Sequence, residues 1–220
     1  MFAENLKHKI MQTIKKPLSI KVIYWITNIT FWLYAAATVL ALALVVVLLF
    51  GILEDLQLHV GIPVAFNVVE QGTLDLNLSS KYINIEMVEM YGKIHFIDTP
   101  VAVGRVYSIF IFTIVTLFFY IFYTFRQFIN NVYNGKYFDF DNIALLKRIS
   151  YAIVATWIFT AFNAYFQYFF LVSNMQFNSL ESTGNVQTYP VILLVALFIW
   201  VLSHIFMKGC ELQDENTLTV

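Results

Sequence analysis

Four long apolar stretches dominate the pattern of hydrophobic and polar positions along the chain. They cover residues 29–53, 105–125, 149–172 and 190–207, and the block from Ala35 to Phe50 contains no charged residue. A helix crosses a hydrocarbon core of roughly 30 Å with about 20 residues, and it satisfies its own backbone polar groups there. The pattern therefore predicts an α-helical integral membrane protein with four transmembrane helices.

The segment 54–104, between the first two stretches, changes to a two-residue period. The apolar positions that alternate with polar ones are Leu74, Leu76, Leu78, Ile83, Ile85, Met87, Ile94 and Phe96, and the intervening glycines are Gly61, Gly72 and Gly92. Such alternation indicates half-buried strands, and glycines between them suit turns. We expect a small antiparallel β insertion of three to five strands, arranged as a meander that rests on the adjoining helix ends because fifty residues make a marginal core.

The basic residues divide unevenly between the two sides of a four-span arrangement. One side carries Lys7, Lys9, Lys15, Lys16, Lys21, Arg126, Lys136, Lys147, Arg148 and Lys208, and the other carries Lys81, Lys93 and Arg105. Lysine and arginine accumulate in cytoplasmic segments of membrane proteins. We therefore expect both termini to be cytoplasmic, with 1–28, 126–148 and 208–220 inside and the 54–104 insertion and the 173–189 loop outside.

The N-terminal segment 1–28 has a helical rather than a strand period. Leu6, Ile10, Ile14 and Leu18 recur every four residues with lysines between them. This spacing predicts a basic amphipathic helix at the membrane surface. It either binds anionic lipid or a partner protein, or it only orients the first span.

The 126–148 loop contains the signals of a helix start. Gly135 follows an asparagine, a turn pair, and Asp139 can accept a backbone hydrogen bond as the N-cap of the next helix. Asp141 falls in the first turn, where a carboxylate complements the helix dipole. Phe138 and Ile143 occupy the two positions of a hydrophobic staple. The motif therefore predicts a capped entry into the third span.

Composition excludes several classes of protein. Hydrophobic residues make up 60% of the chain and charged residues 12%, and the mean hydropathy is +0.71. Soluble domains contain roughly 45–50% apolar and about 25% charged residues, so a water-soluble enzyme domain is excluded. A net charge of −1 offers no basic surface for direct nucleic-acid binding. The single cysteine, Cys210, allows no intramolecular disulfide and no paired-cysteine metal site.

Polar chemistry inside the predicted spans is limited to one pair. Asn163 and Gln167 lie four residues apart in the third span and share a helical face. They either line a polar path or join neighbouring helices through amide hydrogen bonds. No ionisable residue falls near the middle of a span, which disfavours a proton- or ion-coupled transporter.

Other candidate chemistry outside the spans is sparse. The plausible outer metal ligands are His59, Glu70, His95 and Asp98, and their spacing matches no metal motif. Cys210 is either lipidated or inert. The chain contains no nucleophile elbow, zinc-protease motif, phosphate-binding loop or dinucleotide fingerprint. We therefore expect no cofactor and no metal, and nothing in the chain argues for an enzyme.

Two stretches resemble a known family. One is the turn Asn134–Asn142, continued by Leu145–Ile149, and the other is the ending Ile205–Val220, which contains the run E-L-Q-D-E-N-T-L-T-V. Both are similar to the bacterial membrane proteins grouped as domain of unknown function 2975, which have four spans, a G-K-x-F-[S/D] turn and a similar ending. Asp139 stands where serine is usual, and it keeps the capping role.

The resemblance implies a bacterial plasma (inner) membrane location and assigns no activity. It implies that Gly135, Phe138, Asp139 and Asn142 form the family's helix-cap motif. It also offers a Cro/CI-type helix-turn-helix regulator as a cytoplasmic partner, because such genes commonly lie beside those of the family. The segment 54–104 is longer than in many members.

Three functions compete on this sequence. The first is a non-enzymatic regulatory protein that couples the outer β insertion to a cytoplasmic partner. Its docking tail would be the acidic ending, with Glu211, Leu212, Asp214, Glu215 and Leu218 as the contacting residues; the alternative for that ending is a solvated, frayed terminus. The second function is a small transporter or channel subunit, and the third is a membrane enzyme or an assembly factor for one.

Overall fold

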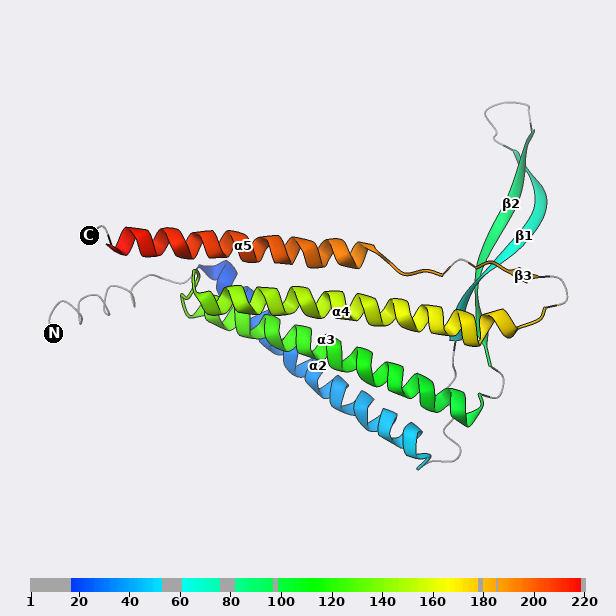
Figure 1. Ribbon diagram of the computed structural model, residues 1–220, viewed down its shortest axis with the longest axis horizontal. Helices are drawn as coiled ribbons and strands as arrows, with labels where there is room; N and C mark the ends of the chain where they lie inside the picture. The colour runs from blue at the N-terminus through cyan, green and yellow to red at the C-terminus, as the bar shows by residue number, and fades with distance from the viewer. Residues whose placement is uncertain are drawn as a thin grey trace. The chain divides into compact units, whose positions relative to one another are not determined.

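Four long helices form the framework of the chain (Figure 1). The structure is a computed structural model that describes residues 17–52, 61–75, 82–96, 99–177, 180–184 and 186–218. The helices of this described part are α2 (Leu18–Phe50), α3 (Val101–Tyr133), α4 (Phe140–Phe170) and α5 (Val191–Leu218). Each is long and apolar enough to cross a membrane, which confirms the predicted fold class of a multi-pass helical membrane protein with a small antiparallel sheet.

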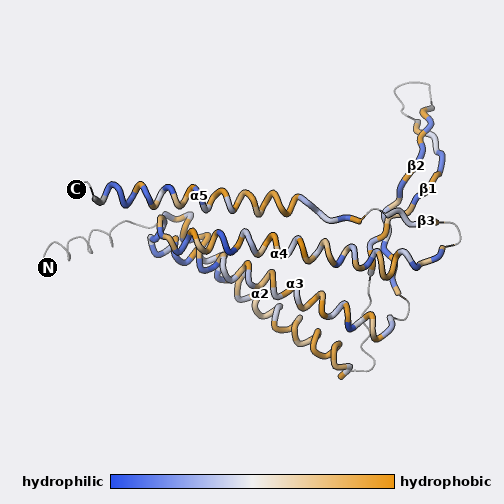
Figure 2. Tube along the Cα trace, in the orientation of Figure 1, coloured by the Kyte–Doolittle hydropathy of each residue, from blue (hydrophilic) through white to orange (hydrophobic). Residues whose placement is uncertain are grey.

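The helices run beyond the apolar stretches that reveal them in the sequence. α2 begins at Leu18 with no break near residue 29, α3 continues past Phe125 to Tyr133, and α5 continues past Met207 to Leu218. No proline lies in these extensions, so nothing interrupts the backbone hydrogen bonds of each helix. Figure 2 shows the change along α5 from apolar residues to a polar C-terminal end. The predicted amphipathic positions Leu6, Ile10 and Ile14 lie outside the described residues.

The sheet has three antiparallel strands in the order β2-β1-β3. β1 (Gly61–Asp75) and β2 (Tyr82–His95) form a long ribbon, and β3 (Glu181–Ser182) pairs with β1 at Phe66 and Asn67. Three antiparallel strands agree with the expected three to five, but the expectation that they form a meander within 54–104 is wrong. The described part of that segment holds two long strands, and the third comes from the loop between α4 and α5.

Two of the three glycines expected at turns between strands lie inside strands instead, and Gly61 is the first residue of β1. Gly72 pairs with Ile85, and Gly92 pairs with Val64. A Cβ at Gly92 would lie 3.8 Å from the ring of Phe66, so the strand passes close to a large side chain there. The positions of Leu76 and Leu78 lie outside the described residues.

The core of the sheet unit, which comprises Leu42–Ile114 and Trp157–Pro190, forms around the first half of β1. Ile62, Val64 and Phe66 alternate along one face and pack with Tyr107 of α3 and Val172, which follows α4. As expected, the sheet rests on adjoining helix ends.

A change of register ends this alternation. Asn67 pairs with Glu89 and Glu70 with Met87, so two residues of β1 oppose one residue of β2, which is a β-bulge. Beyond it the ribbon is exposed. The alternating residues that the sequence predicted as half-buried, Ile83, Ile85 and Met87, are 46%, 48% and 42% exposed. The prediction is wrong there because the core forms on the near-continuous apolar run before the bulge.

The second compact unit comprises Met1–Ala41, Val115–Thr156 and Val191–Val220. Its helices are joined by polar as well as apolar contacts. The Arg126 Nε donates to Asn28 Oδ1 at 2.8 Å, and its guanidinium lies 4.4 Å from the ring centroid of Phe31. The Ser150 hydroxyl donates to the Ala196 carbonyl at 2.8 Å, and both residues are buried. These bonds link α2 to α3 and α4 to α5.

Candidate functional sites

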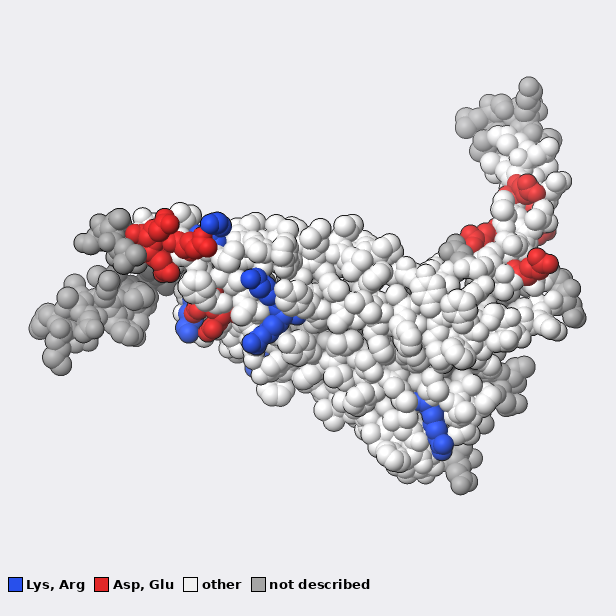
Figure 3. All heavy atoms as spheres, viewed as in Figure 1, with Lys and Arg blue, Asp and Glu red and all other residues white. Residues whose placement is uncertain are grey.

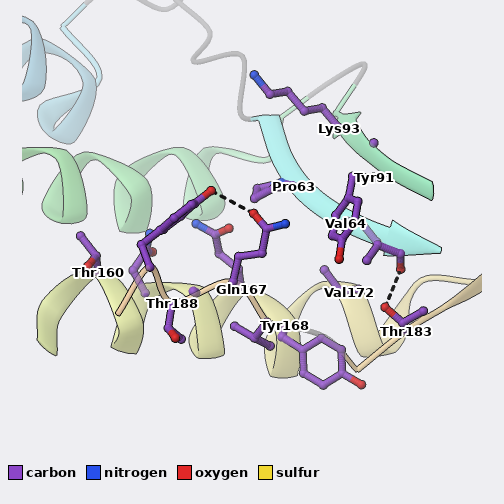
Figure 4. Close-up of a pocket in the computed structure, with 17 residues that line it drawn as sticks. Pro63, Val64, Tyr91, Lys93, Thr160, Gln167, Tyr168, Val172, Thr183 and Thr188 are labelled. Atoms are coloured by element: carbon purple, nitrogen blue, oxygen red, sulfur yellow. Dashed lines mark hydrogen bonds between the residues drawn. The ribbon is translucent and has the colours of Figure 1, made fainter. Parts of the chain in front are cut away.

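A pocket of about 540 Å³ lies within the sheet unit (Figure 4). It is bounded by the start of β1, the end of β2, one face of α4 and the segment that precedes α5. Its lining residues are Pro63, Val64, Ala65, Tyr91, Gly92, Lys93, Thr160, Asn163, Ala164, Gln167, Tyr168, Val172, Thr183, Val186, Gln187, Thr188 and Tyr189. The volume is in the range of pockets that hold small organic ligands.

α4 contributes the polar pair identified in the sequence. Thr160, Asn163, Ala164 and Gln167 follow the spacing of a single helical face, and all four line the pocket. The Asn163 Oδ1 atom is buried and has no hydrogen-bond partner in the described part of the chain. Gln167 is 9% exposed. The structure therefore places both amides at a cavity bounded by the sheet, a surrounding that the helical spacing alone does not reveal.

The segment before α5 closes one side of this pocket; one hydrogen bond joins it to α4, and another lies within the segment. The Trp157 Nε1 donates to the Thr188 carbonyl at 2.8 Å, and the Tyr189 hydroxyl donates to Gln187 Oε1 at 2.9 Å. Tyr189 has a φ of 47°, in the left-handed region that residues with a side chain rarely adopt. Backbone strain of this kind persists only where surrounding contacts enforce it, and it is concentrated at binding sites.

The sheet side of the pocket presents uncharged hydroxyl groups. The Tyr91 hydroxyl donates to Glu89 Oε2 at 2.9 Å, and this bond to a carboxylate raises the pKa of Tyr91 above its ordinary value. Tyr91 is thus a neutral phenol at physiological pH. The Thr183 hydroxyl donates to the Ala65 carbonyl at 3.3 Å. This bond joins the segment that follows β3 to β1. Lys93 is the one charged residue among the described lining residues.

The second candidate site is the turn between α3 and α4, which contains the predicted cap motif. Gly135 has a φ of +85°, and the N–H of Lys136 donates to the Asn131 carbonyl at 3.0 Å. The Gly135 N–H donates to the Val132 carbonyl at 3.1 Å. These two bonds form a Schellman motif, which ends α3 and requires the left-handed backbone that glycine adopts without strain.

The start of α4 is fixed by Asp139 and Asn142. The N–H of Asp141 donates to Asp139 Oδ1 at 3.1 Å, the bond that an N-cap side chain accepts. Asn142 is fully buried, and its Nδ2 donates to the carbonyls of Lys136 and Tyr137 at 2.5 and 3.1 Å. Its Oδ1 accepts from Asn131 Nδ2 at 2.9 Å. One amide thus holds the end of α3, the turn and α4 together.

Phe138 lies against α5. Its ring centroid is 5.9 Å from that of Phe206, and a Cβ added at Gly209 would collide with the Phe138 ring. The sequence predicted a staple with Ile143, and it did not predict this contact with α5. Gly209 is therefore the position at which α5 leaves room for the turn.

A depression of about 370 Å³ adjoins the same turn. α3 contributes Gln127, Asn130 and Asn131, and α4 contributes Asp141, Ala144, Leu145 and Arg148. The Asn130 Oδ1 is buried without a hydrogen-bond partner in the described part of the chain. Sequence reasoning missed these asparagines, although two adjacent amides at the end of an apolar helix are the signal that could have identified them.

The acidic ending is helical in the structure. Glu211, Leu212, Asp214 and Glu215 lie on α5, and acidic side chains gather at its C-terminal end (Figure 3). Lys208 pairs with Glu211 at 2.5 Å, and Leu212 is 59% exposed. α5 extends to Leu218, whose side chain lies outside the described residues. The segment 208–218 therefore continues the fourth helix.

The outer metal candidates are not brought together. His59 and Asp98 lie outside the described residues. His95 pairs with Gly61 at one end of β1, whereas Glu70 lies nine residues further along that strand, about 30 Å away at 3.3 Å per residue. Within the described residues, no three histidine, cysteine or acidic side chains form a group that could hold a metal ion. Cys210 is 3% exposed.

Comparisons with known proteins agree with the resemblance found in the sequence. A family model described as "Protein of unknown function (DUF2975)" matches residues 82–220, which include the turn, both candidate amides and the acidic ending. Searches of curated proteins and of solved structures found no match.

Proposed function

We propose that this chain, which belongs to the DUF2975 family, is a non-enzymatic regulatory membrane protein that couples its sheet unit to a cytoplasmic partner. On this proposal both termini are cytoplasmic, and the protein resides in the plasma membrane of a bacterium. The partner docks on the C-terminal end of α5, and a Cro/CI-type helix-turn-helix regulator is the first candidate. The observation that carries the proposal is the continuation of α5 as a helix to Leu218.

An ordered helix presents the acidic residues in fixed positions. The end of α5 carries Glu211, Asp214 and Glu215 beside the exposed Leu212. Glu211 pairs with Lys208 on the same helix, whereas Asp214 and Glu215 lie close to the C-terminal end of α5, where acids oppose the helix dipole, so helix stability does not explain those two. An acidic surface with an apolar anchor complements a basic protein surface, and such complementarity favours association and specificity. A DNA-binding regulator is a partner of that charge.

Helix α4 offers the route of coupling. It is one uninterrupted helix of 31 residues that begins at the capped turn and carries Asn163 and Gln167 near its other end. A helix of this length spans about 46 Å, more than the hydrocarbon core of a membrane. A change at the pocket that shifts or rotates α4 is therefore transmitted along a rigid element.

Co-purification of the full chain from its native membrane tests the docking. The wild-type protein should retain one cytoplasmic partner. A chain that lacks Glu211–Val220 should lose it, and so should the double variant Asp214→Lys, Glu215→Lys. The variant Gln213→Lys adds one positive charge on the same helix without removing an acid, and it is the matched control. Recovery of the same partner at wild-type yield with the truncated chain would refute the docking role.

Cysteine labelling tests the orientation. In a Cys210→Ala background, a cysteine at Asn84 of β2 should react with an impermeant reagent from outside the cell. A cysteine at Asn134 should react only after permeabilisation. The expectation rests on ten of the thirteen basic residues falling on one side. The opposite labelling pattern would contradict the proposed orientation and, with it, a cytoplasmic partner at α5.

A small transporter or channel subunit is the second candidate, and the pocket that contains Asn163 and Gln167 favours it. Flux measured in reconstituted vesicles distinguishes the two. A regulator should show no flux above that of empty vesicles. A saturable flux that Asn163→Leu abolishes would favour the transporter and count against the proposal.

A further inference from the structure

We propose that the pocket in the sheet unit binds a small, uncharged, hydroxyl-bearing ligand with one apolar face, the chemistry of a monosaccharide or disaccharide. The site is independent of the proposed docking at the end of α5. It lies entirely within one compact unit of the chain, among residues 63–65, 91–93, 160–172 and 183–189.

The first argument is the unpaired amide of Asn163. Its Oδ1 is buried and has no hydrogen-bond partner among the described residues, while its side chain lines a cavity of about 540 Å³. Buried polar atoms in native proteins are nearly always paired, and an orphan calls for an explanation. An acceptor oxygen requires a donor, so the ligand should supply an O–H or N–H group at this atom.

The second argument is the density of uncharged polar groups around that atom. Three threonine hydroxyls, three tyrosine hydroxyls and three amides line the same cavity: Thr160, Thr183, Thr188, Tyr91, Tyr168, Tyr189, Asn163, Gln167 and Gln187. Groups of this kind can both donate and accept. They suit a ligand with several hydroxyls. The hydroxyls of Thr160, Thr183, Tyr91 and Tyr189 already donate within the protein, and their oxygens can still accept from a ligand.

The third argument is the charge of the lining. The described lining residues include no aspartate or glutamate, and the carboxylate beside them, that of Glu89, already accepts from the hydroxyls of Tyr91 and Thr183, so no carboxylate of the lining itself pairs with an ammonium group. Lys93 is exposed, and Figure 4 shows its side chain extending away from Gln167 and Thr188. No cation therefore points into the cavity to pair with a carboxylate. A charged ligand would lose its hydration in the cavity without gaining a partner of opposite charge, which disfavours both cationic and anionic ligands.

The fourth argument is the apolar wall. Pro63, Val64, Ala164, Val172 and Val186 line the pocket among the polar groups. Sugars carry C–H groups on one face and hydroxyls at their edges, so one face can lie on aliphatic and aromatic side chains while the edges form hydrogen bonds. Strand backbone with unpaired polar groups does not face hydrocarbon in membrane proteins, so on this proposal a polar ligand reaches the pocket from water.

Equilibrium dialysis of the full chain in detergent tests the proposal with radiolabelled D-glucose and maltose. Charged analogues of the same size, gluconate and glucosamine, are the comparison. We expect saturable binding of at least one neutral sugar. Its charged analogues should bind at least about tenfold more weakly, the ratio that 1.4 kcal/mol gives. Binding of neither sugar, or tighter binding of a charged analogue, would overturn the proposal.

Variants of the lining locate the site. Asn163→Leu keeps the branching and the number of side-chain heavy atoms and removes the orphan acceptor, so it should weaken sugar binding about tenfold or more, because the ligand donor is then left unpaired. Phe162→Leu changes the adjacent residue, which is 58% exposed and outside the lining, and it should leave the affinity unchanged. Hydrogen exchange in the segment 186–189, which Trp157 contacts, reports the fold of the unit in both variants. Equal affinities for wild type and Asn163→Leu would show that the sugar binds elsewhere and would refute the site.

Discussion

The replacement of Asn142 by leucine should open the turn between α3 and α4 more than the loss of the Asp139 cap does. Asn142 is fully buried and makes three hydrogen bonds, to Lys136 O, Tyr137 O and Asn131 Nδ2. Leucine has the same branching and number of side-chain heavy atoms and makes none of them. Each bond contributes about 1 kcal/mol. Because Lys136 and Tyr137 are exposed, water can compensate part of the loss, which leaves about 2 kcal/mol.

The Asp139 variants provide the scale for this effect. Asp139→Ala removes one capping bond, the one from the Asp141 N–H, and should cost about 1 kcal/mol. Asp139→Ser keeps a capping oxygen and should cost close to nothing. The order of destabilisation should therefore be Asn142→Leu, then Asp139→Ala, then Asp139→Ser.

Hydrogen exchange of the peptide 131–146 measures local opening directly, because exchange reports the free energy of local unfolding. Protection should fall about 30-fold for Asn142→Leu and about fivefold for Asp139→Ala, the factors that correspond to about 2 and 1 kcal/mol. Asn163→Leu, the same replacement on the same helix, should leave this peptide unchanged. If Asn142→Leu proved no more disruptive than Asp139→Ala, the buried amide would not be what holds the turn.

Three further predictions concern single contacts, each read by detergent-denaturation midpoints unless stated. Gly209→Ala should destabilise the protein by about 1 kcal/mol through its collision with Phe138. In a Phe138→Ala background the same replacement should instead stabilise the protein by about 1 kcal/mol, because alanine has the higher helix propensity. Additive effects of the two replacements would contradict the contact. Arg126→Lys should cost about 1 kcal/mol because lysine cannot reproduce the planar contact over an α2 ring, and an unchanged midpoint would argue against it. Trp157→Phe should speed hydrogen exchange in the segment 186–189, because phenylalanine cannot donate to the Thr188 carbonyl. Unchanged exchange there would show that the indole does not hold the segment.

The sequence predicts the helices and the capped turn because both depend on local rules. A run of about 20 apolar residues is sufficient to identify a membrane helix. Gly135 and Asp139 act on backbone groups within a few residues of themselves, so their roles follow from neighbouring positions. The sequence does not predict the helix ends, because hydropathy identifies only the apolar part of a helix. A helix such as α5 continues beyond its apolar stretch for as long as its backbone hydrogen bonds continue.

The sheet and the pocket depend instead on contacts between distant segments. Alternation places Ile83 and Ile85 on one face of a strand, but it does not say whether anything covers that face, and both are exposed. β3 has two residues and pairs with Phe66 across more than a hundred positions, so no local pattern identifies it. The core strand residues Ile62 and Val64 lie in a run too uniformly apolar to show a period.

Asn163 marks the boundary between these two kinds of information. Its polarity in an apolar span indicates a special role, and the four-residue spacing to Gln167 gives the face. Whether that role is to join helices or to bind a ligand depends on what faces the amide. In the structure the facing groups are the start of β1 and the segment before α5, and within the part of the chain that the structure describes the Asn163 Oδ1 has no partner. A helix-joining amide would have paired across the interface, so the unpaired oxygen at a cavity favours binding.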